Sequence, residues 1–206
     1  MKYCLLLLFL FATTAPLRAA ALVEGRIYLK NGSVVECTGD DRLQLPQKSG
    51  KLKIFRDAFR KTKTKDVLPA GDIDSVNCWH AKTPEHVRKL VWASDPGWMW
   101  VYVETPHIRA CIYSKKGYCV DTNGGMLVRQ RSGWFSSSRV AYFLQKHDES
   151  EFQNIGSTYR RSKDVFRERI ARYIDDDPEL AERIRRSNAY RDKTILMLRD
   201  YDPTKY

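Results

Sequence analysis

The sequence predicts an α+β protein, in which a β-rich body from about residue 24 to residue 150 precedes a C-terminal part of about three helices. Two observations predict this class. Over the first two thirds of the chain, short runs of β-branched and aromatic residues alternate with Gly, Asn and Pro turn signals, a pattern typical of antiparallel strands. After residue 157 the apolar residues instead recur every three or four positions, which is typical of amphipathic helices.

Residues 1–21 have the features of a secretory signal peptide. Lys2 precedes an apolar run over residues 4–12, and small residues follow as far as Ala21. This run is too short to cross a bilayer core of roughly 30 Å as a helix. No later run approaches the roughly 20 apolar residues that a transmembrane helix needs. We therefore predict an exported protein, periplasmic or secreted after cleavage near Ala21, without a transmembrane segment in the mature chain.

Residues 22–82 predict a small β-module, either a strongly curved sheet or a barrel. Within residues 24–38, Asn31-Gly32 separates two β-rich runs, and a two-residue loop there would place Leu29 opposite Val34. Asn31-Gly32-Ser33 is also a glycosylation sequon, but the turn explains the glycine. Two further strand-like runs follow at residues 51–59 and 72–79.

Residues 83–150 predict a short helix followed by antiparallel strands. Thr83 is a suitable N-cap and Pro84 a suitable first helical residue, and apolar residues follow at helical spacing. A strand buried on both faces is predicted over residues 98–104, because its alternate residues are apolar on either face. Further strand-like runs extend to Lys146, with turn signals such as Lys116-Gly117 between them.

Residues 151–206 predict the C-terminal helices. Ser162 is a candidate N-cap for the first, in which Phe166 and Ile170 share one face. Between the first and second helices stand three aspartates, Asp175 to Asp177, directly before Pro178. Asp-Pro favours a helix start, with aspartate as cap and proline at the first position. A calcium loop of the helix-loop-helix type would need glutamate at its twelfth position, where this chain has arginine, so we predict a cap and no metal.

Four cysteines remain after Cys4 leaves with the signal peptide. In an oxidising compartment an even number predicts two disulfides, and the sequence does not choose among three pairings. Two of the four flank a turn and would lie opposite each other if a short hairpin joined them. A zinc site is the weaker interpretation, since no two tight pairs of ligands with fixed spacing occur. The disulfide candidates are Cys37, Cys78, Cys111 and Cys119, of which the last two flank the turn.

The mature chain is basic. Without Lys2 and Arg18 it keeps 34 Lys and Arg against 25 Asp and Glu, a net charge of +9 that favours anionic partners. Residues 48–65 hold one acidic residue, Asp57, and are typical of a lysine-protected edge strand. They are also a candidate contact for anionic lipid or polysaccharide, and no nucleic acid is expected outside the cell. The basic residues are Lys48, Lys51, Lys53, Arg56, Arg60, Lys61, Lys63 and Lys65.

Four segments, "YLKNGSVVEC", "LPAGDIDSV", "YFLQK" and "YIDDDPELAERI", occur in this order along the mature chain. With them the chain resembles a class of uncharacterised bacterial envelope or secreted proteins that carry a signal peptide. The class has an N-terminal Lys-Asn-Gly hairpin module and a C-terminal helical module built around Pro-Glu-Leu. The resemblance implies a β-rich N-terminal part and a helical tail, and implies no activity.

We therefore predict a non-catalytic binding or structural protein of the cell envelope that uses no cofactor. The alternative is a hydrolase with a cysteine nucleophile. It would need a free thiol at Cys78 or Cys111 and a histidine within hydrogen-bonding distance to act as the base.

Overall fold

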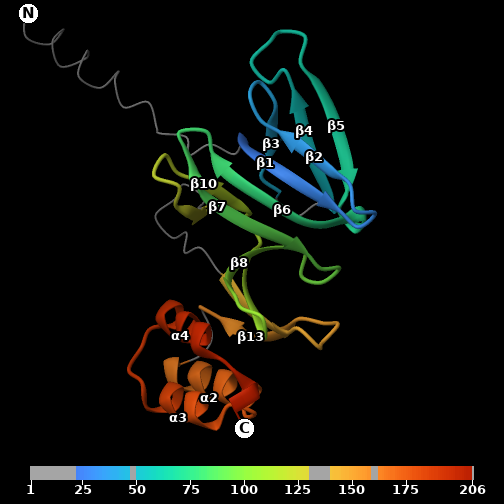
Figure 1. Cartoon of the computed structure of the whole chain (residues 1–206). Helices are drawn as coiled ribbons and strands as arrows, with labels where there is room; N and C mark the ends of the chain where they lie inside the picture. Colours follow the sequence, from blue (N-terminus) through green and yellow to red (C-terminus); the bar gives the residue numbers. More distant parts are fainter. Residues whose placement is uncertain (1–21, 47–49, 130–139, 159–161, 206) are drawn as a thin grey trace, which may run out of the picture.

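The computed structural model describes residues 22–46, 50–129, 140–158 and 162–205 (Figure 1). Its strands form one large and one small antiparallel sheet, and three α-helices follow towards the C-terminus. The predicted α+β class is therefore confirmed. The predicted signal peptide, residues 1–21, lies outside the described residues.

The large sheet has eleven strands in the order β13-β12-β9-β8-β7-β6-β1-β3-β4-β5, and β2 also pairs with β1. Within the described residues this path is open, with β13 and β5 at its two edges, so the strands form a sheet and not the barrel that was the alternative prediction. A separate hairpin consists of β10 and β11. The strands are β1 (Leu22–Leu29), β2 (Val34–Cys37), β3 (Arg42–Gln44), β4 (Lys51–Arg56), β5 (Thr64–Pro69), β6 (Ile73–His80), β7 (Thr83–Trp92), β8 (Trp98–Glu104), β9 (Ile108–Ser114), β10 (Tyr118–Val120), β11 (Met126–Val128), β12 (Val140–Lys146) and β13 (Gln153–Ser157).

The β1–β2 hairpin forms at the predicted place but with a register that differs by one residue. Tyr28, and not Leu29, lies opposite Val34. The N–H of Gly32 donates to the carbonyl of Leu29 at 2.9 Å, and the N–H of Leu29 donates to the carbonyl of Ser33 at 2.9 Å. Gly32 has φ +85°. These contacts describe a three-residue loop that ends in a left-handed glycine, which an Asn-Gly pair fits as well as the two-residue loop.

Residues 83–92 form the strand β7, so the predicted short helix is wrong. β7 pairs with β6 on one side and with β8 on the other, and Leu90 and Val91 are buried in different apolar clusters on its two faces. Pro84 is accommodated because β8 pairs with β7 only from Lys89 onwards. The missing N–H of the proline therefore breaks no hydrogen bond in that ladder. Pairing on both sides outweighs the helical spacing of the apolar residues.

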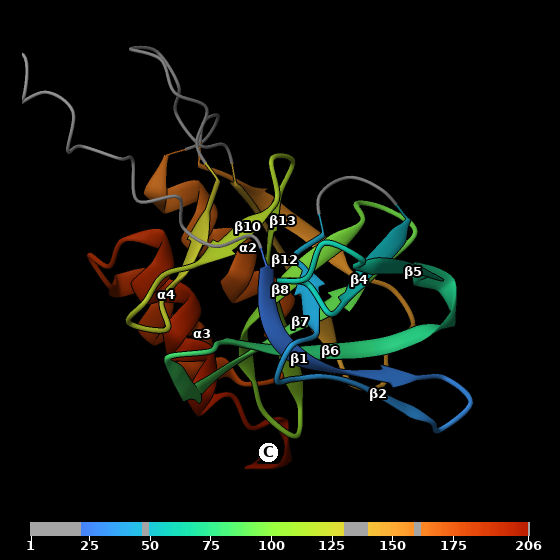
Figure 2. The same ribbon diagram turned by 90° about the horizontal axis from the view of Figure 1, so that it is seen from above.

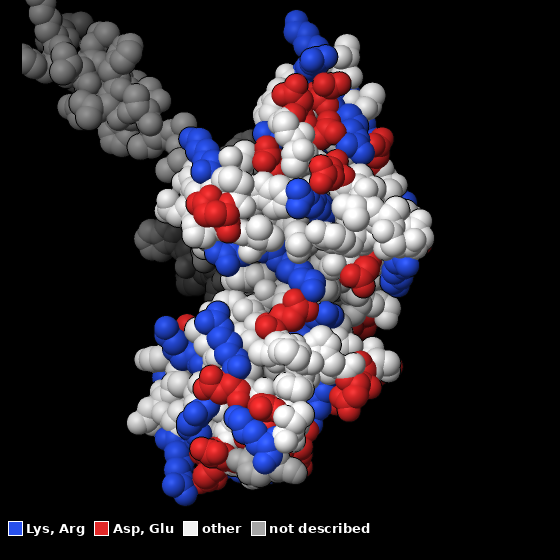
Figure 3. All heavy atoms as spheres, in the orientation of Figure 1, with Lys and Arg blue, Asp and Glu red and all other residues white. Residues whose placement is uncertain are grey.

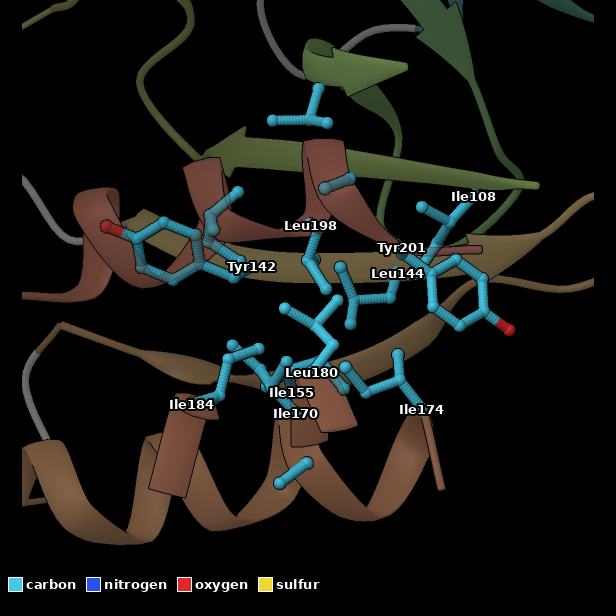
Figure 4. Close-up of a cluster of buried hydrophobic side chains, with 14 of the residues drawn as sticks. Ile108, Tyr142, Leu144, Ile155, Ile170, Ile174, Leu180, Ile184, Leu198 and Tyr201 are labelled. Carbon is cyan, nitrogen blue, oxygen red and sulfur yellow. The ribbon is translucent and has the colours of Figure 1, made fainter. Parts of the chain in front are cut away.

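The helices cover one face of β8, β9, β12 and β13, as Figure 4 shows for Ile108, Leu144 and Ile155 on the strands and Ile170 and Leu180 on the helices. A second apolar cluster fills the β-rich part around β1, β4 and β6. Figures 1 and 2 both place the helices at one end of the molecule and the β4–β5 hairpin towards the other. The helices are α2 (Lys163–Tyr173), α3 (Pro178–Arg186) and α4 (Arg191–Met197), with 3₁₀ turns at Ala70–Asp72, Leu198–Asp200 and Pro203–Lys205.

The three consecutive aspartates end one helix and begin the next, as predicted. Asp177 is the N-cap of α3, and its Oδ1 accepts a hydrogen bond from the N–H of Leu180 at 3.0 Å. Asp176 forms an ion pair with Lys146 at 2.8 Å. No group of three or more His, Cys, Asp or Glu side chains that could hold a metal ion occurs within the described ranges. The Ser162 cap of α2 is also confirmed, with its Oγ accepting from the N–H of Val165 at 3.2 Å.

Candidate anion-binding surface

The predicted basic stretch forms the β4–β5 hairpin, and β5 is an edge strand of the large sheet. Lys48 lies outside the described residues, and the other seven basic residues lie on β4, on the loop over residues 57–63 and on β5. In the space-filling view, basic atoms lie at the outer tip of this end of the molecule with acidic side chains just beneath them (Figure 3). The prediction of an exposed edge is therefore confirmed.

Arg56 and Arg60 are engaged in ion pairs within this part of the protein. Arg56 contacts Asp41 at 2.5 Å and Asp66 at 2.9 Å, and both carboxylates belong to neighbouring segments. These contacts lower the pKa of Asp41 and raise that of Arg56, mainly through the hydrogen bond that joins the two groups. Arg60 lies 3.5 Å from Asp57 in the loop itself. Arg56 therefore fixes the shape of the hairpin, and the charges of Arg56 and Arg60 are largely offset by their acidic partners.

Four lysines remain exposed and form no ion pair within the described residues: Lys53, Lys61, Lys63 and Lys65. Lys53 lies opposite Val67, and Lys65 lies opposite Phe55, so both lysines share the outward face of the hairpin. Leu52 and Ile54 alternate with them and are buried on the inward face. The alternation of the strands thus places Lys53 and Lys65 on one side, and Lys61 and Lys63 lie in the loop that joins the strands.

Phe59 stands at the tip of the same hairpin and is 70 % exposed. The guanidinium of Arg42 lies 4.8 Å from the centroid of its ring. The loop is held against the turn before β3, because the N–H of Ala58 donates to the carbonyl of Asp40 at 2.9 Å and that of Asp57 donates to Asp41 at 3.1 Å. A fixed loop thus exposes an aromatic ring on the same hairpin as the four lysines.

The sequence prediction of this surface did not include Phe59, since the run ending there was assigned to a strand. The sequence did contain a signal for an exposed position. Phe59 stands next to Arg60 and Lys61, in a stretch where apolar and polar residues do not alternate as they do in a strand. We name the four unpaired lysines together with Phe59 the basic tip.

All four cysteines are free and buried, so the two predicted disulfides are not formed in this structure. Cys37 on β2 and Cys78 on β6 both lie opposite Gly25, which stands between them on β1. Two strand spacings amount to about 10 Å between Cα atoms, beyond the roughly 7 Å that a disulfide spans. The positions of these cysteines in the sheet therefore explain why Cys37 and Cys78 are not bonded.

The predicted placement of Cys111 opposite Cys119 is also wrong. β9 pairs with β8 on one edge and with β12 on the other, so Cys111 lies between Val101 and Phe143. Cys119 belongs to the separate β10–β11 hairpin, where it lies opposite Leu127. The turn between the two cysteines does not close a hairpin, because it carries the chain from one sheet into another.

Burial raises the pKa of all four thiols, to about 11 for Cys37 and about 12 for Cys78. A cysteine nucleophile needs the opposite shift, because the thiolate is the reactive form. No hydrogen bond joins a histidine to a cysteine within the described part of the chain; the Nδ1 of His80 accepts from the N–H of Lys82 instead. The geometry therefore gives the hydrolase alternative no support.

Stability is expected to fall above pH 9, because the buried thiols lose protons more easily when the chain unfolds. Their contribution is complete below the ordinary thiol pKa of 9.0 and is lost as the pH rises towards about 12 for Cys78. We expect urea unfolding to show a loss between pH 8 and pH 10 that is about 1 kcal/mol smaller in Cys78→Ala than in the unaltered protein. An equal loss of stability in both proteins would contradict the raised pKa of Cys78.

No helix within the described residues combines the length and the apolar character needed to cross a membrane. No family model, curated protein or solved structure matches this chain.

Proposed function

We propose that this protein is an exported, non-catalytic binding protein of the bacterial envelope, and that the basic tip attaches it to an anionic membrane surface. The observation that carries the proposal is that one edge hairpin has four exposed lysines without an ion pair in the described residues, and that its loop also carries the exposed Phe59. Lysines attract anionic headgroups, and an exposed aromatic ring adds burial in the interface. A lipid surface accounts for both features, because its headgroups attract the lysines and its interface buries the aromatic ring.

The strength expected of such a contact is moderate. Each lysine near an anionic surface contributes about 1 kcal/mol, and salt screens the attraction over about 8 Å at physiological ionic strength. Arg56 and the acidic partners that it binds hold the hairpin in shape before it meets the surface. Little conformational entropy is therefore lost on binding.

Sedimentation with vesicles tests the proposal. We expect the mature protein to bind phosphatidylglycerol vesicles and not phosphatidylcholine vesicles, and to dissociate as the salt concentration rises. Replacing the lysines of the basic tip by glutamine should weaken binding at least tenfold, and Phe59→Ser should weaken it at fixed charge. A matched control replaces four exposed lysines elsewhere: Lys82, Lys115, Lys116 and Lys193.

Two results would contradict the proposal. One is equal binding to both kinds of vesicle. The other is an equal loss of binding in the basic-tip variant and in the control variant, because net charge alone would then explain the attraction. Binding that is insensitive to Phe59→Ser and is competed by an acidic polysaccharide would assign the basic tip to a polysaccharide.

A further inference from the structure

A second charged feature lies at the opposite end of the molecule, along the exposed side of α2. Two hollows of about 500 Å³ and about 420 Å³ lie there, and both are lined by Arg169 and Arg172. The first extends towards Arg185 on α3, and the second extends towards Gln153 and Asn154 on the edge strand β13. We name the two hollows together the arginine groove.

Arg169 is the central residue of the arginine groove, and no carboxylate lies within ion-pairing distance of it in the described residues. One of its guanidinium nitrogens, Nη1, donates to the carbonyl of Ile155 at 3.2 Å. This bond fixes the guanidinium at the border of the two hollows, and the group has further N–H donors to offer. Arg169 is half-buried and has no counterion in the described residues, whereas the buried Arg167 pairs with Asp164 and the exposed Arg172 and Arg185 pair with Glu168.

Arg172 and Arg185 are held on the same side by one carboxylate. Glu168 accepts from the Nε of Arg172 at 2.8 Å and from the Nε of Arg185 at 3.0 Å. Arg185 also lies 3.7 Å from Glu182 through its Nη1. Each guanidinium has five N–H donors, so both arginines keep donors that can reach a second anion. Glu168 thus keeps two arginines in place from neighbouring helices.

The lining charges of the larger hollow are not balanced. It has four arginines against two carboxylates, an excess of two positive charges. A phosphate monoester carries about −1.5 to −2 at pH 7 and offers three oxygens to guanidinium groups. The hollows fall in the size range of small-ligand sites, so an organic group can accompany the phosphate. Its polar atoms would meet the amides of Gln153 and Asn154.

From these contacts we propose that the arginine groove binds a phosphate monoester, with Arg169, Arg172 and Arg185 holding the phosphate. This site is separate from the basic tip and does not depend on the proposed membrane attachment. The ester can belong to a soluble small molecule or to the headgroup of a lipid such as phosphatidic acid.

Isothermal titration with glycerol 3-phosphate at low salt tests the site. We expect saturable binding of one ligand per chain, and at least a tenfold weakening in Arg169→Gln. Arg186→Gln is the matched control, because Arg186 is exposed on α3, pairs with Glu182 at 2.6 Å and does not line the groove. That variant removes the same charge and should weaken binding less than twofold.

A pH series provides a second readout. Binding of glycerol 3-phosphate should tighten between pH 5 and pH 7.5, because the second phosphate pKa is about 6. Methyl sulfate, which carries a single charge throughout this range, should bind more weakly and show no such change. Vesicles with phosphatidic acid, used with the lysine variant of the basic tip, distinguish a lipid source from a soluble one.

Three results would overturn the proposal: no saturable binding of glycerol 3-phosphate by the unaltered protein, equal weakening in Arg169→Gln and Arg186→Gln, or equal affinity for methyl sulfate. If Arg169→Gln does not fold, Arg172→Gln decides instead, because Arg172 is exposed and, within the described residues, its ion pair is with Glu168 alone. Unchanged binding in Arg172→Gln would then overturn the site. If the basic-tip variant loses vesicle binding but still binds glycerol 3-phosphate, the basic tip and the arginine groove act as separate sites.

Discussion

Gly25→Ala is expected to destabilise the fold by at least about 2 kcal/mol, since a methyl group at this position meets the backbone of the neighbouring strand. A Cβ built on Gly25 lies 2.5 Å from the carbonyl oxygen of Asn77 on β6 and 3.3 Å from a methyl of Leu43. The carbonyl belongs to the ladder and cannot rotate away as a flexible side chain can. The β1–β6 pairing would therefore have to separate or shift.

Chemical denaturation monitored by tryptophan fluorescence measures this effect. Gly71→Ala is the matched control, because a Cβ there has no neighbour within 4 Å and its φ is not positive. We expect the control to unfold at the denaturant concentration of the unaltered protein. A Gly25→Ala midpoint equal to that of Gly71→Ala would show that the two strands move apart without cost.

Asp177→Ala is expected to cost about 2 to 4 kcal/mol, the sum of a lost helix cap and an unsatisfied buried N–H. Asp177 is only 2 % exposed, and each carboxylate oxygen has its own donor. Oδ1 accepts from the N–H of Leu180 at 3.0 Å, and Oδ2 accepts from the N–H of Asp202 at 3.2 Å. The side chain therefore begins α3 and also holds the C-terminal segment.

The asparagine variant separates these two contributions. From the sequence alone Asp177→Asn would be nearly silent, because asparagine caps almost as well as aspartate. The structure predicts an intermediate loss instead, since the amide NH₂ would face the N–H of Asp202. Exposed Asp175→Ala should have little effect. A calcium-dependent rise in melting temperature that disappears in Asp177→Asn would contradict the cap and restore the metal interpretation.

The sequence predicted those parts of the fold that depend on interactions between residues close together in the chain. The caps at Ser162 and Asp177 were predictable because side chain and backbone donor are three residues apart. The three helices and most strands were predictable for the same reason, since their periodicity is local. The hairpin at Asn31-Gly32 was predicted in place, but its register depended on one extra loop residue that the same dipeptide allows.

Features that depend on distant partners were not predicted. β7 has a proline and apolar residues in a helical pattern, and only its pairing with β6 and β8 makes it a strand. The thiols were expected to pair because their number is even, yet the sheet order separates Cys37 from Cys78 by Gly25 and sends Cys119 into another sheet. In each case the deciding contact joins segments that lie far apart in the sequence, and no local sequence pattern indicates such a contact.

The candidate sites divide in the same way. The sequence by itself determined that basic residues concentrate between residues 48 and 65, because charge is a property of composition. Only the tertiary structure decided which of them are neutralised, since the partners of Arg56 come from a separate turn and from the opposite strand. It also decided the arginine groove, because Arg169, Arg185 and Asn154 become neighbours only when α2 packs between α3 and the edge of the sheet.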